Sequence, residues 1–418
     1  MRPHRSNAIP LMLGVSCAAA ALSAGEASFA AFAKRAQAGE RLSVVFLGGS
    51  LTWGANASDQ AYTSYRAQVA RMLRETYPQA RFEFHDAAIG GTGSLLGVFR
   101  LERDALRHKP DLLFLDFTAN DGIEGEDVDS LAAYESILRR TIGAARCPVL
   151  PVIFPFKYDI DESRFPRMKR REAHLALAEA YGTCAGDAVE RVYRRVKSGA
   201  TTLQKLWPFD PAHPGDEGYL IFAEAAFEAL ARCVKEERVC KLPERPLHGA
   251  TYFTWTRYRL ALAEPKPSGW AVVPPLRTAA WHDSVMSRWL DDEVRAHTGK
   301  VTAGAESPAE QTKASVAPWT LRFQASTVLL FGTKTSASGT YRVRIDGEYI
   351  QNRDHGPEFD ASSAKFGGNV NLCHLVATGL DPERIHELVL EPVFAAGKEQ
   401  ELRIESVCLA GGAARVVP

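Results

Sequence analysis

From about residue 41 to residue 240, apolar runs alternate with amphipathic stretches along the chain. The run LSVVFLGGS (42–50) has the continuous apolar character of a strand that is buried on both faces. In the following stretch TSYRAQVARMLRETYP, Val69, Met72 and Leu73 share one face of a predicted helix. Further strand patterns, each followed by a helical pattern, lie at 82–89, 111–120 and 148–154. The alternation predicts parallel strands joined by right-handed crossovers, and hence a three-layer α/β domain over residues 25–247.

The pattern changes after residue 248. From 319 to 418 the apolar segments are short and β-rich, and Gly, Asp or Asn turns separate several of them. This spacing favours an all-β, jelly-roll-like sandwich of antiparallel strands. The stretch 248–318 carries several Pro and Trp residues and the polar run VTAGAESPAEQTKA, so we interpret it as a linker or inter-domain segment.

The N-terminus has the anatomy of a signal peptide. Arg2 and Arg5 precede the apolar run IPLMLGVSCAAAALSA, which is too short to span a bilayer comfortably. We therefore expect residues 1–24 to be removed and the protein to be secreted or periplasmic, with no stable membrane insertion afterwards. Six cysteines follow this leader. Exported cysteines can be oxidised, and Cys233 and Cys240 are the best candidates for a disulfide bridge, although the pairing stays open.

Composition and charge narrow the range of partners. Lys plus Arg and Asp plus Glu number 50 each, so no net charge draws the chain toward nucleic acid, and we expect no nucleic-acid partner. No Cys/His cluster has the spacing of a zinc site. The acidic stretch 116–129 lacks the spacing of an EF-hand calcium site, so we interpret it as a solvated loop. We therefore predict no metal and no cofactor. The oligomeric state stays open.

Four short motifs follow strands or precede a helix, and each carries a polar group suited to acyl transfer. Ser50 stands in GGSLT, Gly91 in AIGGTGS, Asn120 in TAND, and Asp210 with His213 in DPAHPGDEGY. The carboxyl edge of an open parallel sheet is where ligands bind, so these groups are expected to converge there. Each motif is weak when taken alone, because a turn, a helix cap or a strand-end hydrogen bond is then a better explanation than catalysis.

Together the motifs predict a nucleophile with its proton-handling partner. A serine hydroxyl is a poor nucleophile, and His213 is suited to take its proton while Asp210 orients the imidazole. The backbone N–H groups of Ser50 and Gly91 and the side-chain amide of Asn120 would hold the oxyanion, each donor being typically worth a factor of about 10²–10³ in kcat.

Taken in order, these motifs resemble those of the SGNH (GDSL) hydrolase family. Gly49 stands where the family more commonly has Asp, which puts only the local loop geometry in question. The resemblance covers about residues 41–240. It implies a flavodoxin-like sheet and a serine esterase that works through an acyl-enzyme.

The substrate is predicted less directly than the chemistry. Export, aromatic residues near the motifs and an appended sandwich favour removal of O-acetyl groups from a polysaccharide or oligosaccharide. Trp53 and Trp207 would stack on a sugar ring, and Arg100 would meet an anionic substrate, although core packing or a surface role suits each of them as well. The alternatives are a lipase or thioesterase, an acyltransferase with the same triad, and a catalytically silent carbohydrate-binding protein.

Overall fold

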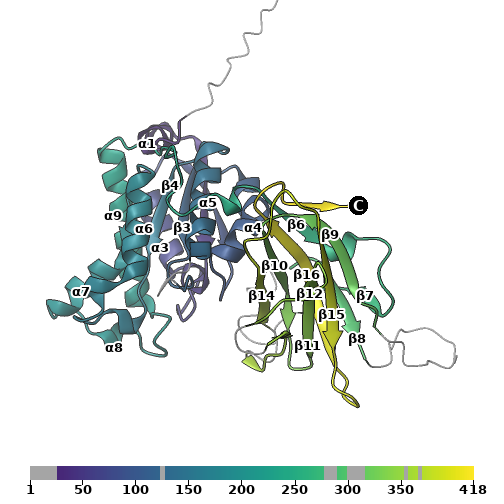
Figure 1. Cartoon of the computed structure of the whole chain (residues 1–418). Coiled ribbons are helices and arrows are strands. Elements are labelled where there is room, and N and C mark those ends of the chain that lie inside the picture. Colours follow the sequence, from purple (N-terminus) through teal and green to yellow (C-terminus); the bar gives the residue numbers. More distant parts are fainter. Residues whose placement is uncertain (1–25, 123–127, 277–289, 299–315, 353–355, 366–369) are drawn as a thin grey trace, which may run out of the picture.

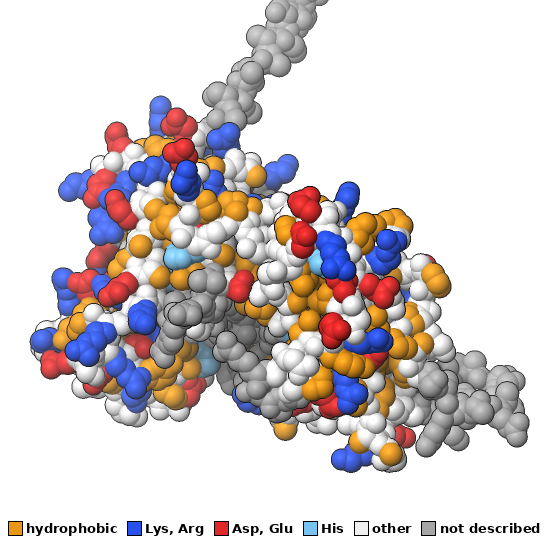
Figure 2. All heavy atoms as spheres, viewed as in Figure 1, with side chains coloured by type: hydrophobic (Ala, Val, Ile, Leu, Met, Phe, Trp, Pro, Cys, Tyr) orange, Lys and Arg blue, Asp and Glu red, His pale blue; other side chains and the backbone are white. Residues whose placement is uncertain are grey.

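The computed structural model describes residues 26–122, 128–276, 290–298, 316–352, 356–365 and 370–418. Figure 1 shows an α/β domain packed beside a domain of antiparallel strands. The predicted leader 1–24 lies outside the described residues. Within them, no helix combines the length and the apolar character needed to cross a membrane. Lys and Arg side chains are interspersed with Asp and Glu over the face of the α/β domain in Figure 2, in keeping with the formal net charge of zero.

The α/β domain is built on a five-stranded parallel sheet in the order β2-β1-β3-β4-β5. Its strands are β1 (Arg41–Gly48), β2 (Arg81–Ala88), β3 (Leu112–Asp116), β4 (Val149–Ile153) and β5 (Gly186–Asp187). Its helices are α1 (Phe29–Gln37), α2 (Ser50–Trp53), α3 (Tyr65–Thr76), α4 (Ser94–Asp104), α5 (Val128–Gly143), α6 (Lys169–Ala180), α7 (Ala188–Lys197), α8 (Leu203–Leu206) and α9 (Asp216–Lys235). This flavodoxin-like order confirms the predicted three-layer fold.

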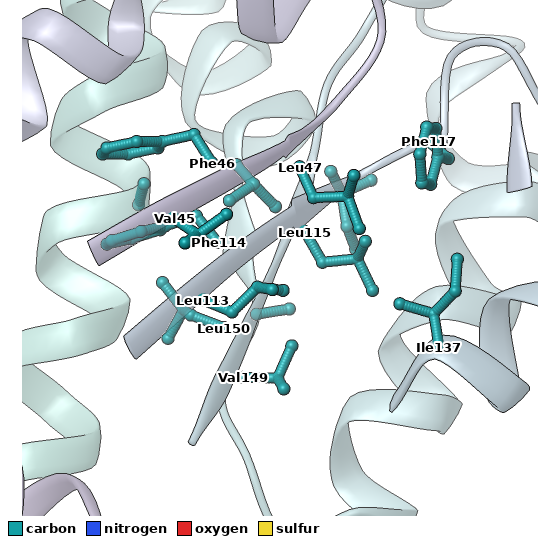
Figure 3. Packing of buried hydrophobic residues seen from close by; sticks show 14 of the residues in the cluster. Val45, Phe46, Leu47, Leu113, Phe114, Leu115, Phe117, Ile137, Val149 and Leu150 are labelled. Carbon is teal, nitrogen blue, oxygen red and sulfur yellow. The ribbon is translucent and has the colours of Figure 1, made fainter. Parts of the chain in front are cut away.

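The central strands are apolar throughout because helices cover both faces of the sheet. The stacked rings of Phe46 and Phe114 have centroids 5.0 Å apart, and Tyr65 of α3 lies edge-on to Phe46. Figure 3 shows Leu47 and Leu115 on the opposite side of the strands, toward Ile137 of α5, and all of these side chains belong to one buried cluster. Each fully buried side chain of this size contributes roughly 1.5–3 kcal/mol relative to exposure.

The second domain consists of two antiparallel six-stranded sheets, which confirms the predicted sandwich. One sheet has the order β14-β10-β16-β8-β7 with β6 paired to β16, and the other has β12-β11-β15-β9-β17 with β13 paired to β11. Its strands are β6 (Trp255–Arg259), β7 (Trp270–Val273), β8 (Glu293–His297), β9 (Trp319–Gln324), β10 (Thr327–Lys334), β11 (Thr340–Ile345), β12 (Glu348–Tyr349), β13 (Glu358–Asp360), β14 (Val370–Ala377), β15 (His386–Val393), β16 (Glu401–Ala410) and β17 (Arg415–Val417).

The interpretation of 248–318 as a linker is wrong for much of that stretch. Three of its segments, β6, β7 and β8, are strands of the first sheet, and β6 and β8 both pair with β16 at the far end of the chain. Strands this short, separated by Pro-rich turns, give little periodicity, so only their distant partner β16 identifies them as strands. The polar run 301–314 lies outside the described residues.

The two domains share an apolar interface because the first sheet is buried on both faces. Along β10, Val328 and Leu330 face the interior of the sandwich, whereas Leu329 and Phe331 belong to the core cluster of the α/β domain. Alternation of side chains across a strand produces this division. Figure 1 shows α4 at the boundary between the two domains, where its Phe99 packs against the sheet.

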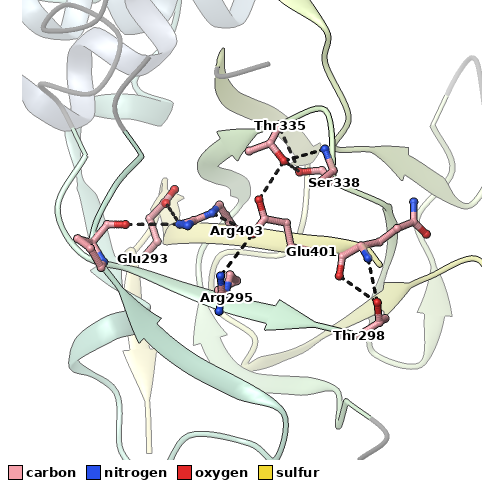
Figure 4. A network of polar contacts seen from close by, with 10 residues as sticks. Glu293, Arg295, Thr298, Thr335, Ser338, Glu401 and Arg403 are labelled. Atoms are coloured by element: carbon pink, nitrogen blue, oxygen red, sulfur yellow. Dashed lines mark hydrogen bonds and ion pairs between the residues drawn. The ribbon is translucent and has the colours of Figure 1, made fainter. Parts of the chain in front are cut away.

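A buried polar network links β8, β16 and the end of β10 in the first sheet (Figure 4). On β16, Arg403 pairs with Glu293 of β8 at 3.1 Å and with Glu401 at 3.3 Å. The other oxygen of Glu401 accepts a hydrogen bond of 3.0 Å from Thr335 Oγ1. Burial raises the pKa of Glu293 to about 7, against the opposing effects of the Thr333 hydroxyl and Arg403. Buried ion pairs of this kind add little net stability, but breaking one is costly, so the network favours this strand pairing over others.

All six cysteines in the described residues are free thiols, so the structure does not contain the expected bridge between Cys233 and Cys240. Cys233 lies on the buried face of α9, where its sulfur accepts a hydrogen bond of 3.0 Å from the backbone N–H of Cys184. Its neighbour is therefore a residue distant in the sequence, and the short spacing to Cys240 is misleading.

Candidate active site

The sheet order places a topological switch point at the carboxyl ends of β1 and β3. After β2 the chain crosses to the other side of β1 and forms β3, so the connections from β1 and β3 leave in opposite directions. Ligands bind at such a switch point in open α/β sheets. Ser50 begins α2 directly after β1, and Asn120 follows β3. Both predicted residues therefore flank the switch point.

The structure brings Ser50 together with His213 and Asp210. Nε2 of His213 lies 2.9 Å from Oγ of Ser50, and its Nδ1 lies 3.2 Å from Oδ2 of Asp210. The other carboxylate oxygen of Asp210 accepts hydrogen bonds from the backbone N–H groups of Ala212 and His213 at 2.7 and 2.8 Å. Burial acts to raise the pKa of Asp210, but these two donors, the His213 charge and Asn56 outweigh it and hold that pKa below its usual value. Asp210 is therefore ionised at neutral pH.

The loop that carries Asp210 and His213 is anchored on both sides. The backbone N–H of Gly215 donates to the carbonyl of Leu206 at 2.8 Å, and α9 begins at the next residue. The backbone N–H of Lys157, in the turn after β4, donates to the carbonyl of Pro211 at 2.8 Å. These bonds fix a loop that has little regular structure of its own, so the imidazole is held toward β1.

The first three motifs meet at Gly49. A Cβ atom on Gly49 would lie 2.3 Å from Oδ1 of Asn120 and 3.3 Å from the carbonyl oxygen of Thr92, so only glycine fits without displacing a neighbour. Gly91 precedes Thr92 and has a φ of +70°, a conformation that favours glycine. The presence of Gly49, where the SGNH (GDSL) family more commonly has Asp, therefore has a steric reason in this chain. Glycine allows Asn120 to approach the turn that carries Ser50.

Asp121 holds the second and third motifs together. Its carboxylate accepts hydrogen bonds from the backbone N–H of Ser94 at 2.7 Å and from the hydroxyl of Ser94 at 2.6 Å. The carboxylate thus caps the N-terminus of α4, where a negative charge is favourable. The interpretation of Asp121 as part of a solvated acidic loop is wrong, because it is buried at the site.

Asp116, the last residue of β3, is also buried. The interpretation of the acidic stretch 116–129 as a solvated loop is therefore wrong for this residue too. Its Oδ2 accepts a hydrogen bond of 3.0 Å from the hydroxyl of Thr52, in the helix that begins with Ser50. Burial raises the pKa of Asp116 to about 7, although its bonds from Thr52 and Thr118 act in the other direction. A carboxyl group that titrates near neutrality therefore lies directly beneath the nucleophile turn.

Two of the three predicted substrate-binding residues face the interior instead. Arg100 is fully buried, and its guanidinium donates to the carbonyls of Ala87 and Gly48 at 2.6 and 3.0 Å. These carbonyls lie at the ends of β2 and β1, so Arg100 supports the strand ends and is not available to an anionic substrate. Trp207 is 1% exposed and packs against Phe222 in the core. Trp53 is half-buried, and its contact with a sugar remains a prediction.

Two exposed aromatic side chains beside this loop are not among the residues predicted from the sequence. Phe209, directly before Asp210, is 76% exposed, and Tyr158 is 45% exposed. They belong to the two segments joined by the hydrogen bond between Lys157 and Pro211. An aromatic residue next to the Asp-x-x-His motif was the available signal. The sequence pattern of an irregular loop does not show which of its aromatic side chains is buried, so it does not distinguish Trp207 from Phe209.

Within the residues covered by the structure, no group of three or more His, Cys, Asp or Glu side chains is arranged to hold a metal ion. What the site does contain is a hydroxyl, an imidazole and a carboxylate in hydrogen-bonded sequence. Such an arrangement can deprotonate a serine as it attacks a carbonyl carbon and can return the proton to the leaving group.

Comparisons with known proteins give one family model and several solved structures to which this chain is similar. The model of the GDSL-like lipase/acylhydrolase family matches residues 46–221. A two-domain esterase (CEX) active on acetylated mannans superposes with a TM-score of 0.70 at 22% identity, covering 92% of this chain and 95% of that chain. Its crystal form with mannopentaose gives the same TM-score and identity, with 92% and 94% covered. The acetylxylan esterase Axe2 from Geobacillus stearothermophilus covers 45% of this chain and 94% of its own, with a TM-score of 0.39 at 20% identity. No curated protein sequence gives a significant match.

Proposed function

We propose that this chain, whose N-terminal domain belongs to the GDSL-like lipase/acylhydrolase family, removes O-acetyl groups from polysaccharides through an acyl-enzyme formed on Ser50. The observation that carries the proposal is the continuous hydrogen-bonded path from Oγ of Ser50 through the His213 imidazole to the Asp210 carboxylate. A serine hydroxyl without such a partner is a weak nucleophile at neutral pH.

The proposed reaction has two symmetrical halves. Nε2 of His213 takes the proton of Ser50 as Oγ bonds to the acetyl carbon, and the carbonyl electrons move to the oxyanion. The backbone N–H groups of Ser50 and Gly91 and the amide of Asn120 would donate to that oxygen. As the intermediate collapses, the ester bond breaks and the sugar oxygen leaves with the proton from Nε2. Water then attacks the acetyl-enzyme with the same base, and acetate and free Ser50 result.

Several features support a carbohydrate as the leaving group. The structurally similar esterase is described as active on acetylated mannans and has been crystallised with mannopentaose. In this chain, Phe209 and Tyr158 expose their rings beside the loop of the proposed triad, where they would stack on sugar rings. The segment from Lys157 to Arg171 that follows β4 is rich in charged residues, so a long acyl chain would find little apolar cover there. We therefore favour an acetylesterase over a lipase.

Export forms part of the proposal. The basic and then apolar N-terminus supports a secreted or periplasmic location, where polysaccharides are accessible. An acyltransferase would use the same residues, because a sugar hydroxyl and water compete for one acetyl-enzyme. Product analysis with and without an acceptor oligosaccharide separates the two activities. A silent binding protein would instead release no acetate from any substrate.

The catalytic part of the proposal is tested with Ser50→Ala on p-nitrophenyl acetate. We expect kcat to fall to the background rate, because the nucleophile is removed. Ser198→Ala is the matched control, since Ser198 is an exposed residue at the end of α7 and its replacement should leave the activity at the wild-type level. Substantial activity in Ser50→Ala would contradict the proposed mechanism.

The substrate part is tested with Phe209→Ala. Its KM for acetylated mannan or xylan should rise severalfold, because a stacking surface is lost, whereas kcat/KM for p-nitrophenyl acetate should stay unchanged. Leu262→Ala is the control, because Leu262 is 70% exposed but lies in the short helix after β6. Equal KM values for Phe209→Ala and wild type on every polysaccharide would contradict a sugar-binding role for this ring.

A further inference from the structure

Asn56 is in direct contact with the proposed acid–base pair. Its Nδ2 donates to Oδ2 of Asp210 at 2.6 Å, the same oxygen that lies 3.2 Å from Nδ1 of His213. The same amide lies 3.3 Å from the carbonyl oxygen of His213. Asn56 has a φ of +68°, a conformation that Asn adopts more readily than most residues with a side chain. One side chain therefore touches both members of the pair.

The segment that carries Asn56 is fixed to the start of α9. The hydroxyl of Tyr219 donates to the carbonyl of Ala55 at 2.6 Å. Ser58 donates to Asp216 twice, from its backbone N–H at 2.8 Å and from its hydroxyl at 2.6 Å. These bonds hold the chain that leaves the Ser50 helix against the helix that follows His213. The Asn56 amide is thus presented to Asp210 by a short, well-anchored loop.

We infer that Asn56 is a positioning residue for the reaction proposed above, and the inference rests on that proposed function. It acts through Asp210: by donating to Oδ2 it fixes the rotation of the carboxylate, and the carboxylate in turn directs the imidazole at Ser50. Because Asn56 lies six positions after Ser50, the nucleophile turn and the acid–base loop are joined by a direct bond and hold one geometry. Misplacement of reacting groups by about 1 Å can cost roughly 10²-fold in rate.

The charge of residue 56 matters as much as its position. The titratable groups facing Asp210 among the described residues are His213 in its own loop and Tyr219 of α9, and Asp216 accepts its hydrogen bonds from Ser58. A neutral donor suits this place, because Asp210 already supplies the negative charge that an imidazolium needs. A second carboxylate here would lie within hydrogen-bonding distance of the first, and two such groups cannot both ionise freely.

Two substitutions separate this role from simple structural support. Asn56→Gly removes the donor and keeps the positive φ without strain. We expect its kcat/KM on p-nitrophenyl acetate to fall roughly tenfold at every pH. Asn56→Asp should approach wild-type activity at low pH, where a proton shared with Asp210 lets the introduced carboxyl group donate in place of the amide. Its activity relative to wild type should then decline as the pH rises and the two carboxylates repel each other.

Ser58→Ala is the matched control, since it removes the hydroxyl contacts with Asp216 and Thr63 from the same loop without touching Asp210. Its activity relative to wild type should not vary with pH across the neutral range. A pH-independent ratio for Asn56→Asp, or wild-type kcat/KM for Asn56→Gly, would overturn the inference. Ser50→Ala, assayed in parallel, reports on the proposed function separately. If it is inactive while the Asn56 variants behave like wild type, the positioning role fails and the esterase mechanism stands.

Discussion

The ring of Phe331 on β10 lies edge-on to the ring of Phe99 on α4, with the centroids 5.6 Å apart and the planes at 75°. Phe99 belongs to the α/β domain and Phe331 to the sandwich, and both are almost fully buried. Arg103, also on α4, lies 3.8 Å from Asp291 at the sandwich side. The N-terminus of the same helix is capped by Asp121 at the proposed site. The sandwich therefore supports the helix that follows the Gly91 turn.

We expect Phe331→Ala to lower the free energy of unfolding by about 3–5 kcal/mol, the usual cost of emptying a buried phenylalanine site. Leu330→Ala is the control, because Leu330 is on the same strand but faces the interior of the sandwich. Urea titration followed by esterase activity is the measurement. Activity should be lost at lower urea concentration in Phe331→Ala than in Leu330→Ala, and coincident curves would argue against interdomain support. Point variants are preferable to deletion after residue 318, which would expose the apolar surface around Phe99.

The close approach of Asn120 to Gly49 predicts what the addition of one methyl group at residue 49 does to the site. In Gly49→Ala the new Cβ would displace the Asn120 side chain, which is exposed and free to move, so stability should change little. The proposed oxyanion donor would be lost, and kcat should fall by about 10²–10³-fold. Steady-state kinetics on p-nitrophenyl acetate measure this effect.

A double-mutant cycle tests whether the methyl group acts through Asn120. The double variant Gly49→Ala/Asn120→Ala should be no slower than Asn120→Ala alone, because the two changes remove the same interaction. If the two effects multiply instead, Gly49→Ala impairs the site by another route.

Asp116→Asn should make stability less dependent on pH. The folded-state pKa of Asp116 is about 7, against an ordinary value of 3.8. Below that ordinary value the carboxyl group is protonated in both states and costs nothing. As the pH rises toward 7, only the unfolded state releases its proton, so the wild type loses up to about 1.4 kcal/mol per pH unit from this group. Above about 7 the loss is complete.

The measurement is urea unfolding of both proteins at pH values on either side of this window. The stability of Asp116→Asn relative to the wild type should rise from about pH 4 to about pH 7 and then level off. Asp161→Asn serves as the control, because Asp161 is exposed and its hydrogen bond from Ser163 lowers its pKa below the usual value. Its relative stability should be flat across the same window. A flat curve for Asp116→Asn would show that Asp116 is ionised throughout.

The local sequence determined the parallel sheet and the order of the motifs at its edge. Continuous apolar runs such as 42–47 identify strands covered on both faces, and a turn directly after such a strand places Ser50 at the carboxyl edge whatever the rest of the chain does. The spacing of Asp210 and His213 is likewise local. These features depend on residues only a few positions apart, so the local backbone conformation is enough to determine them.

Other features were decided only by contacts between distant segments. Whether Arg100 and Trp207 face solvent, whether Asp116 and Asp121 are buried, and whether Asn56 reaches Asp210 depend on packing that periodicity does not encode. The same holds for β6, which is a strand because β16 lies beside it. The imidazole of His213 meets the Ser50 hydroxyl across 163 positions of sequence. Packing of the helices against the sheet brings these two residues together. The sequence motifs therefore identified both residues as candidates, and only the tertiary structure determined the distance between them.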